Sequence, residues 1–321
     1  LWTSLSLSAQ ENILTSRVLR EPVQKVSEVN DANSVTTIEY YDTAGRLIQT
    51  IRKGFGPNGE DLADYIQFDE AGRIAKEYLS TPFTGNNGVF VPVSEFEQST
   101  QTWSRTHLYE ASTEGRIVET SGMHVGGKSI KYDYRLSNSS EPELSALEFR
   151  MQNNTTINKR MAARGAYQVV EEIDEDGHRI LLFTDSDGHT VLKRRVDGDV
   201  YHDTYMVYDA YDHLRCVLPP AAVDAYSSFD DQSLSAGNFL DLYAYFYIYD
   251  NDNQCVGVKY PGADWIYTVY DGDYRPILSQ DGNQRKRDEW SFIKYDGLGR
   301  VVIEGIVKDK RTRDDLADIY E

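Results

Sequence analysis

One short motif recurs along the chain and constrains the fold more than any other feature. Its clearest copy is YDGLGR, which contains Tyr295, Asp296, Gly299 and Arg300. Aspartate suits the first position of a type I turn, because its carboxylate accepts hydrogen bonds from backbone N–H groups two and three residues on. Glycine then supplies the positive φ that a following bulge requires. Because apolar and polar residues alternate on both sides, the motif predicts a β-hairpin.

The same copy predicts a contact across the hairpin. Tyr295 and Arg300 leave the turn on facing strands, so we expect the guanidinium group to lie on the tyrosine ring. We also expect positive φ at the glycine of this copy and of two earlier copies. Those copies contain Tyr41, Asp42, Gly45 and Arg46, and then Phe68, Asp69, Gly72 and Arg73.

Looser copies fill the rest of the chain, and one of them, Glu110 to Arg116, has a turn two residues longer. The acidic turn residues fall at 42, 69, 110, 133, 174, 185, 209, 250, 271 and 296, and a spacing of 21 to 27 residues recurs five times. A fixed period of this length is typical of stacked supersecondary units. The sequence therefore predicts an all-β body of hairpins, each paired with the next.

The motif divides the chain into a lead-in, residues 1–34, and a repeat body, residues 35–321. The first nine residues are apolar and rich in small side chains, which resembles the end of a secretory signal peptide, although an ordinary first strand or tail is the alternative. Two halves meeting near residues 136–166 are one arrangement of the body. In that region the alternation of Leu147, Phe149 and Met151 favours a strand. For a second insertion, residues 219–239, we expect a loop with a short helix.

Composition excludes some partners. The 321 residues carry a net charge of -19, which repels phosphate backbones and anionic lipid surfaces, so nucleic acid is not an expected partner. The longest apolar runs fall short of the roughly 18 residues that a membrane span needs. We therefore predict no membrane span.

The segment LDLYAYFYIYD alternates strictly and predicts one long strand from Leu240 to Tyr249, with a second face lined by tyrosines. Together with a nearby tryptophan, this face is a candidate platform for stacking sugars, and a packed strand in a layered β body is the alternative. The candidate ligand-binding residues are Tyr243, Tyr245, Tyr247, Tyr249, Trp265 and Tyr267.

Other chemistry has weaker support. The aspartates near 174, 185 and 250 resemble the start of calcium loops, but the turn glycine comes early and no glutamate closes the loop at the twelfth position. The six histidines are dispersed without metal-ligand spacing. With 52 acidic residues, a pair of carboxylates at glycosidase separation is expected by chance. We predict no catalytic residue, no metal ligand and no cofactor.

The units, Y-D-x-x-G-R followed by an aliphatic strand, resemble the YD repeats of the Rhs family. The ordered series HDTYMVYD, LDLYAYFYIYD, KYPGADWIYTVYD and EWSFIKYDGLGRVVIEG is similar to that of Bacteroidetes-type exported Rhs-repeat proteins. The resemblance implies an open, curled, spiralling sheet that forms part of an Rhs-type shell, often around a variable C-terminal effector domain. It also implies export to the cell surface or beyond, and a longer precursor.

The chain lacks a counterpart of the family's Asp-Pro self-cleavage signature, so the resemblance assigns neither toxin activity nor autoproteolysis to a residue here. The expected function is a structural scaffold segment that displays or encloses a downstream domain, with the remainder of its own chain and an effector cargo as partners. The alternatives are a surface glycan-binding or adhesion module and, less favoured, a glycoside hydrolase.

Two further expectations concern the cysteines and the C-terminus. Aligned on their turn aspartates, Cys216 and Cys255 both point to the buried face, and an intervening strand would keep them apart, so we predict two free thiols. The final unit, Glu289 to Ile306, should present an open strand edge. The polar tail KDKRTRDDLADIYE is expected to be frayed or folded over that edge.

Overall fold

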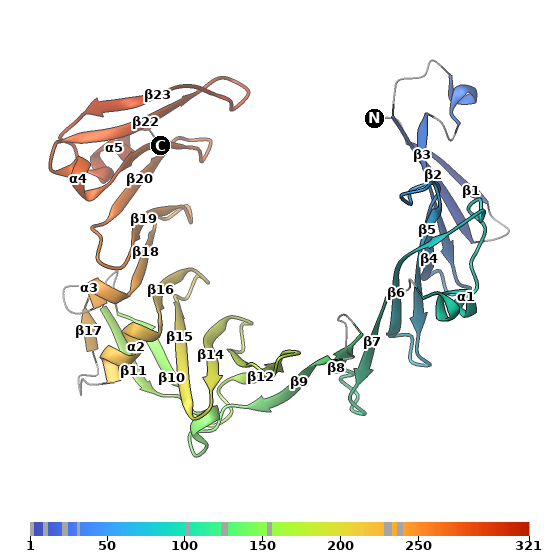
Figure 1. Cartoon of the computed structure of the whole chain (residues 1–321). Coiled ribbons are helices and arrows are strands. Elements are labelled where there is room, and N and C mark those ends of the chain that lie inside the picture. The colour runs from blue at the N-terminus through green and yellow to red at the C-terminus, as the bar shows by residue number, and fades with distance from the viewer. Residues whose placement is uncertain are drawn as a thin grey trace. The chain divides into compact units, whose positions relative to one another are not determined.

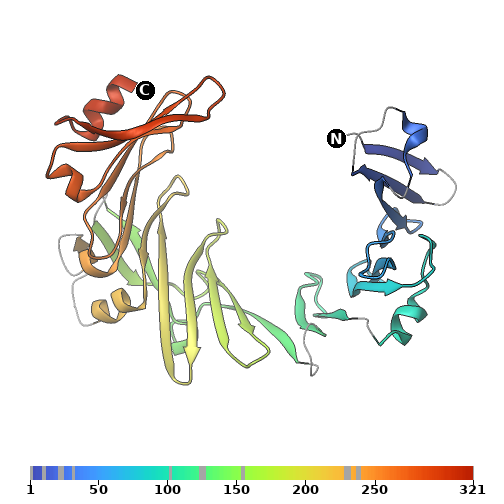
Figure 2. The ribbon, with the colours of Figure 1, turned by 45° about the horizontal axis from the view of Figure 1, so that its top comes forward.

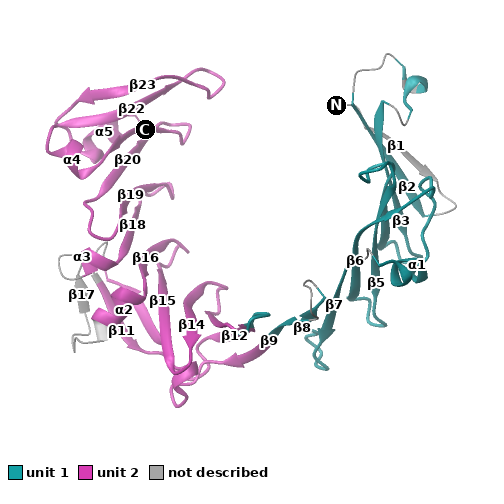
Figure 3. Ribbon diagram, viewed as in Figure 1, with its two compact units in different colours: residues 1–132, 173–177 teal, residues 133–172, 178–321 magenta. Residues whose placement is uncertain are grey.

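The computed structural model describes residues 3–8, 12–20, 25–30, 33–100, 103–122, 128–152, 156–227, 233–235 and 240–320 (Figure 1). The chain forms two compact units, the first made of residues 1–132 and 173–177, the second of residues 133–172 and 178–321 (Figure 3). Each unit is built mainly from antiparallel strands. No helix among the described residues combines the length and apolar character needed to cross a membrane.

The first unit is a series of hairpins, in which each strand pairs antiparallel with the next. Its strands are β1 (Thr3–Ser8), β2 (Ile13–Leu19), β3 (Ser34–Tyr41), β4 (Leu47–Arg52), β5 (Asp61–Phe68), β6 (Ile74–Phe83), β7 (Ser104–Tyr109), β8 (Ile117–Ser121) and the start of β9 (Ser129–Leu136). Its short helices are η1 (Val26–Glu28) and α1 (Val93–Gln98). Strands β1 and β2 thus lie within the predicted lead-in, whose boundary at residue 34 stays a prediction.

The second unit continues the same pattern from β13 to β16 and from β18 to β23. Its strands are β10 (Leu147–Met151), β11 (Thr156–Met161), β12 (Gln168–Ile173), β13 (Arg179–Thr184), β14 (Thr190–Asp197), β15 (Val200–Tyr208), β16 (Leu214–Leu218), β17 (Ser233–Ser235), β18 (Tyr245–Tyr249), β19 (Cys255–Lys259), β20 (Ile266–Tyr270), β21 (Pro276–Gln280), β22 (Glu289–Tyr295) and β23 (Val301–Lys308). Its helices are η2 (Pro142–Leu144), α2 (Pro220–Ser227), α3 (Leu240–Tyr243), α4 (Gly282–Arg285) and α5 (Arg313–Tyr320).

A small second sheet covers part of this unit. Strands β10, β11 and β17 form it, and the strand predicted from Ala146 to Met151 is confirmed as β10, which begins at Leu147. The β10–β11 hairpin, light green, lies against the yellow strands in both views (Figures 1 and 2). There the ring of Phe149 meets that of Tyr205 edge-on, with centroids 4.8 Å apart. The hairpin therefore closes the largest apolar core of the unit.

The predicted turns are confirmed. Gly45, Gly72 and Gly299 have φ of 79°, 82° and 77°. In each hairpin the strand register shifts beside the turn, as a bulge requires. One repeat assignment was wrong, because Asp133 lies inside β9 and not in a turn.

The all-β fold class is confirmed, and the sheet is antiparallel and not closed. Among the described residues, β23 pairs only with β22. The edge predicted for the final hairpin is therefore present. The polar tail does not cover it, which corrects our expectation. Its residues form α5, whose Leu316 and Ala317 are buried against Trp290 and Val269 of the sheet.

The long strand predicted from Leu240 to Tyr249 was also wrong in its first half. Residues 240–243 form α3, in which the N–H of Ala244 donates to the carbonyl oxygen of Leu240 at 2.8 Å. The reason lies in the neighbouring strand. β16 pairs with β18 and ends at Leu218, and the two prolines that follow cannot donate ladder hydrogen bonds. Without a partner strand, the chain before Tyr245 turns into a helix that buries Leu240.

Candidate functional site: the contacts between hairpins

Each turn aspartate organises its own hairpin. The carboxylate of Asp42 accepts the backbone N–H groups of Ala44 and Arg46, both at 2.9 Å, and the side-chain Nε of Arg46 at 2.7 Å. These bonds, with the backbone N–H of Arg46 contributing most, lower the pKa of Asp42. Asp69 and Asp296 make the same bonds to the arginine four residues later. The pKa of each is lowered for the same reason.

The arginine of one hairpin stacks on the aromatic ring of the next. The guanidinium carbon of Arg46 lies 4.2 Å from the ring centre of Phe68, and that of Arg73 lies 4.3 Å from the ring of Tyr109. Arg275 lies 5.1 Å from the ring of Tyr295. The predicted contact of Arg300 with Tyr295 in the same hairpin was therefore wrong. In each motif the hydrogen bonds between the arginine and its own turn aspartate hold the guanidinium group at the turn. The flat face of the guanidinium group then points to the following hairpin and not to the ring of its own hairpin.

Where Arg73 and Arg275 stack on a tyrosine, a hydroxyl hydrogen bond completes the contact. The hydroxyl of Tyr109 donates to the carbonyl oxygen of Ile74 at 2.8 Å, and that of Tyr295 donates to the carbonyl oxygen of Pro276 at 3.0 Å. In both cases the acceptor residue directly follows the stacking arginine. We call the set of turn aspartate, arginine and next aromatic ring the hairpin interlock. The ion pair of aspartate and arginine lies within one hairpin and orients the arginine. The cation–π contact joins that arginine to the neighbouring hairpin, and a hydroxyl hydrogen bond is added where the ring is Tyr109 or Tyr295.

Histidine replaces arginine in two interlocks of the second unit. The ring of His189 stacks on Tyr208 with centres 4.4 Å apart, and that of His213 stacks on Tyr249 at 4.3 Å. Sequence reasoning treated these histidines as dispersed. The signal that identifies them is their position, four residues after a turn aspartate.

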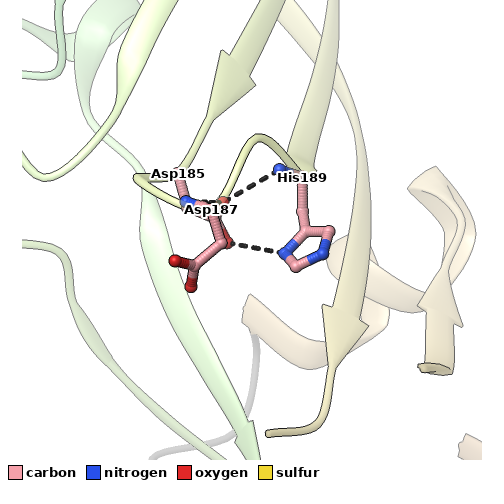
Figure 4. A group of neighbouring side chains, drawn as sticks. All are labelled: Asp185, Asp187 and His189. Carbon is pink, nitrogen blue, oxygen red and sulfur yellow. Dashed lines mark hydrogen bonds and ion pairs between the residues drawn. The ribbon is translucent and has the colours of Figure 1, made fainter. Parts of the chain in front are cut away.

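One of these turns also has the geometry of a metal-ligand group. Asp185, Asp187 and His189 offer ligand atoms within 4.8 Å of one another (Figure 4). The Asp185 carboxylate already accepts the backbone N–H groups of Asp187 and His189, at 3.0 and 2.9 Å. The turn of Asp209 and His213 repeats this arrangement, with the carboxylate 3.4 Å from the imidazole. Turn geometry therefore accounts for the cluster, and we assign no metal site.

A hollow of about 650 Å³ lies beneath the β10–β11 hairpin. Its two arginines, Arg150 and Arg160, both bind the carboxylate of Glu148, at 2.6 Å. Burial raises the pKa of Tyr167, at its inner wall, to about 12. The carboxylates of Asp185 and Asp209, which also line the hollow, accept the backbone N–H groups of their own turns. We assign no ligand to this hollow.

The candidate sugar-stacking residues come from three places. Tyr245, Tyr247 and Tyr249 lie on one face of β18 and are half-buried, whereas Tyr243 belongs to α3. Trp265 precedes β20, and its ring is parallel to that of Tyr267, with centres 6.2 Å apart. Their role in ligand binding stays a prediction. One face of the Tyr249 ring is already covered by a histidine.

Both cysteines are free, as predicted. Cys216 is buried and Cys255 half-buried, and β18 lies between their strands. Burial raises the pKa of the Cys216 thiol well above its ordinary range. A buried protonated thiol is an unreactive packing group.

The chain was compared with protein families, with curated proteins and with solved structures. A family model described as a domain of unknown function, DUF6443, matches residues 15–135. No curated protein matches the chain. A crystal structure of TcdB2-TccC3-TEV matches 96% of the chain with 12% identity and a TM-score of 0.59, and a TcdB2-TccC3 structure without its hypervariable C-terminal region matches 92% with 13% identity and a TM-score of 0.57.

The chain has the fold of part of a Tc toxin chain. A pore structure of the Photorhabdus luminescens Tc holotoxin matches 94% of it, with 13% identity and a TM-score of 0.54. The chain spans only 13% to 14% of the length of the three structures. Identity this low shows a shared fold, and that fold agrees with the resemblance to Rhs repeats.

Proposed function

We propose that this chain is a structural scaffold segment of an exported Rhs/YD-repeat protein of the Bacteroidetes type, and that it displays or encloses a downstream domain. The observation that carries the proposal is the hairpin interlock. In the hairpin interlock the arginine of one hairpin packs on the ring of the next. Such a contact supports the addition of one hairpin after another to a growing sheet. The fold shared with Tc toxin chains supports the same role.

The last interlock is incomplete. Arg300 binds Asp296 at 2.7 Å, but its side chain is 74% exposed and no ring covers it among the described residues. The adjacent edge strand β23 exposes apolar side chains on both faces, with Val302 at 56% and Ile306 at 64% on one face and Ile303 at 53% on the other. Natural edge strands are usually blunted by charges or prolines. We infer that β23 receives a further hairpin, supplied by the remainder of the same longer chain.

The edge can be tested by its tendency to associate. We expect the 321-residue chain to show concentration-dependent association in sedimentation velocity, because an uncovered apolar strand pairs with other strands. Val302→Lys with Ile306→Lys should abolish the association. Val200→Lys, at an equally exposed valine at the start of β15, is the matched control and should leave it unchanged. A chain that stays monomeric at every concentration, or a control variant that behaves like the edge variant, would contradict the proposal.

A surface glycan-binding or adhesion module is the second candidate, and the parallel rings of Trp265 and Tyr267 favour it. A ligand that binds the folded state raises the unfolding temperature by mass action. A scaffold should show no such shift across a panel of glycans. A shift that is lost in Trp265→Ala would favour the binding module instead. Release of product from polysaccharides, lost on substitution of a single carboxylate, would favour a glycoside hydrolase.

A further inference from the structure

A second hollow, of about 330 Å³, lies on the face of β14 and β15 that is turned away from the main core. It is lined by Lys193, Arg195, His202, Thr204 and Pro220. Strand pairing brings these side chains together, because Arg195 lies opposite His202 and Lys193 lies opposite Thr204. Three cationic or protonatable side chains thus share one small surface of a chain whose net charge is -19.

These three groups have no partner of their own. Among the described residues, Lys193, Arg195 and His202 form no hydrogen bond or ion pair. The residue between the first two behaves differently, since Arg194 points into the core and binds Asp203 through two bonds of 2.7 and 2.6 Å. The positive groups of this cluster are therefore free to bind an anion.

The neighbours of the cluster are an apolar strand on one side and the start of a helix on the other. On the other side of β14, the residues opposite Arg195 and Lys193 are the apolar Ile180 and Leu182. Asp197 shares the face two residues after Arg195, but it does not line the hollow. Pro220, the first residue of α2, does line it. The amino end of a helix bears partial positive charge and favours anions.

We propose that this hollow binds a tetrahedral oxyanion, a phosphate or sulfate group. The guanidinium group of Arg195 can donate two parallel hydrogen bonds to such a group, and Lys193 supplies a point charge. His202 and the hydroxyl of Thr204 supply donors from the opposite strand. The hollow is small, and the acidic chain around it repels an extended polyanion, so the ligand is a compact group, either free or carried on a saccharide.

Calorimetric titration tests the site. The probes are inorganic phosphate and sulfate, with chloride at matched ionic strength as reference, and glucose 6-phosphate and glucose 6-sulfate to distinguish a free from a sugar-linked anion. We expect saturable binding that is at least tenfold weaker in Lys193→Gln and in Arg195→Gln. Arg287→Gln, which removes an exposed arginine elsewhere in the same unit, should bind like the parent.

Far-ultraviolet circular dichroism checks that each variant is folded. Thermal shifts are compared between variants and not only between salts, because sulfate stabilises folded proteins without binding to a site. Tighter binding of either sugar ester than of the free anion would identify the source of the group and support the site. Equal heats for chloride and sulfate, or the same loss of affinity in Arg287→Gln as in Arg195→Gln, would overturn the proposal.

Discussion

At the scale of single residues, the turn aspartate has two functions. One carboxylate oxygen accepts the backbone of its own turn, and the other holds the arginine that contacts the next hairpin. This division explains why the motif needs aspartate, glycine and arginine at fixed spacing. In the longer turn after β7, glutamate takes this place, and its extra methylene helps the carboxylate to reach Arg116 at 2.7 Å.

A substitution at the turn glycine tests the backbone requirement. Gly299→Ala should lower the free energy of unfolding by about 1 kcal/mol, because alanine is strained at positive φ. Gly297 is the matched control, since it lies two residues earlier in the same turn, lacks positive φ and has open space around it. Urea unfolding of both variants makes the comparison. Equal effects of the two substitutions would contradict the turn assignment.

Acid titration tests the carboxylate bonds. The side chain of Arg116, followed by the hydroxyl of Ser112, lowers the pKa of Glu110 from 4.5 to about 2. A carboxyl group whose pKa is lowered by folding contributes stability that is complete above its unfolded pKa and is lost as the pH falls through its folded pKa. Between pH 4.5 and 2, the stability of the parent should therefore fall more steeply than that of Glu110→Gln, as measured by urea unfolding at a series of pH values. Parallel curves would show that this bond contributes nothing.

At the scale of elements, the arginine contacts decide how hairpins join. Tyr295 is flanked by two arginines, Arg275 of the preceding hairpin and Arg300 of its own. A double-mutant cycle of Arg275→Gln with Tyr295→Leu should give a coupling energy of about 0.5–1 kcal/mol. The matched cycle of Arg300→Gln with Tyr295→Leu should give a coupling near zero. A larger coupling energy for Arg300 with Tyr295 than for Arg275 with Tyr295 would mean that the ring contacts the arginine of its own hairpin, as the sequence suggested.

The features that depend on residues close in the sequence could be predicted. Those that depend on which strands pair in space could not. Asp296 and Gly299 specify their turn by themselves, so the hairpins were predictable. The ring that receives Arg275 depends on which hairpin pairs next, and residues within one motif carry no such signal. The helix at Leu240 depends on prolines twenty residues earlier that end the partner strand. The cluster at Lys193 and His202 appears only once the register of β14 and β15 is known.

The candidate site could be predicted from the sequence only in part. The turn residues of the motif were identified, but the two histidines that replace arginine, His189 and His213, were not. The candidate tyrosines of β18 do share one face, as their alternation indicated, because β16 pairs with Tyr245 and Phe246 and β19 pairs with the strand from Phe246 to Tyr249. Tyr243 does not, since the helix removes it from that face.

The cysteines give a prediction at the level of neighbouring strands. Cys216 faces Phe246 of β18, and Cys255 faces Tyr249 of the same strand. A whole strand therefore separates the two sulfurs, and a disulfide would require the sheet to open. Mass spectrometry of the unreduced protein should show both thiols free. A peptide linking Cys216 to Cys255 would contradict this pairing order.

At the scale of the whole molecule, the interlocks make stability a property of neighbours. A hairpin that has lost the ring or the arginine beside it keeps its turn and its strand pairing but loses this side-chain contact with its neighbour. The final hairpin is in this state on one side, since within the described part of the chain Arg300 has no ring above it and β23 has one partner. This incomplete end is the reason for our proposal that the chain is a segment of a larger scaffold.

Hydrogen exchange at β23 tests this account most directly. An edge strand bonds through alternate amides only, and the remaining N–H groups face water. We predict that about half of the amides from Val301 to Lys308 exchange rapidly, while those of the internal strands β20 to β22 are protected. The protected half should match the ladder to β22. Slow exchange at every amide of β23 would mean that its outer edge is already covered, and would contradict the open end on which the scaffold proposal rests.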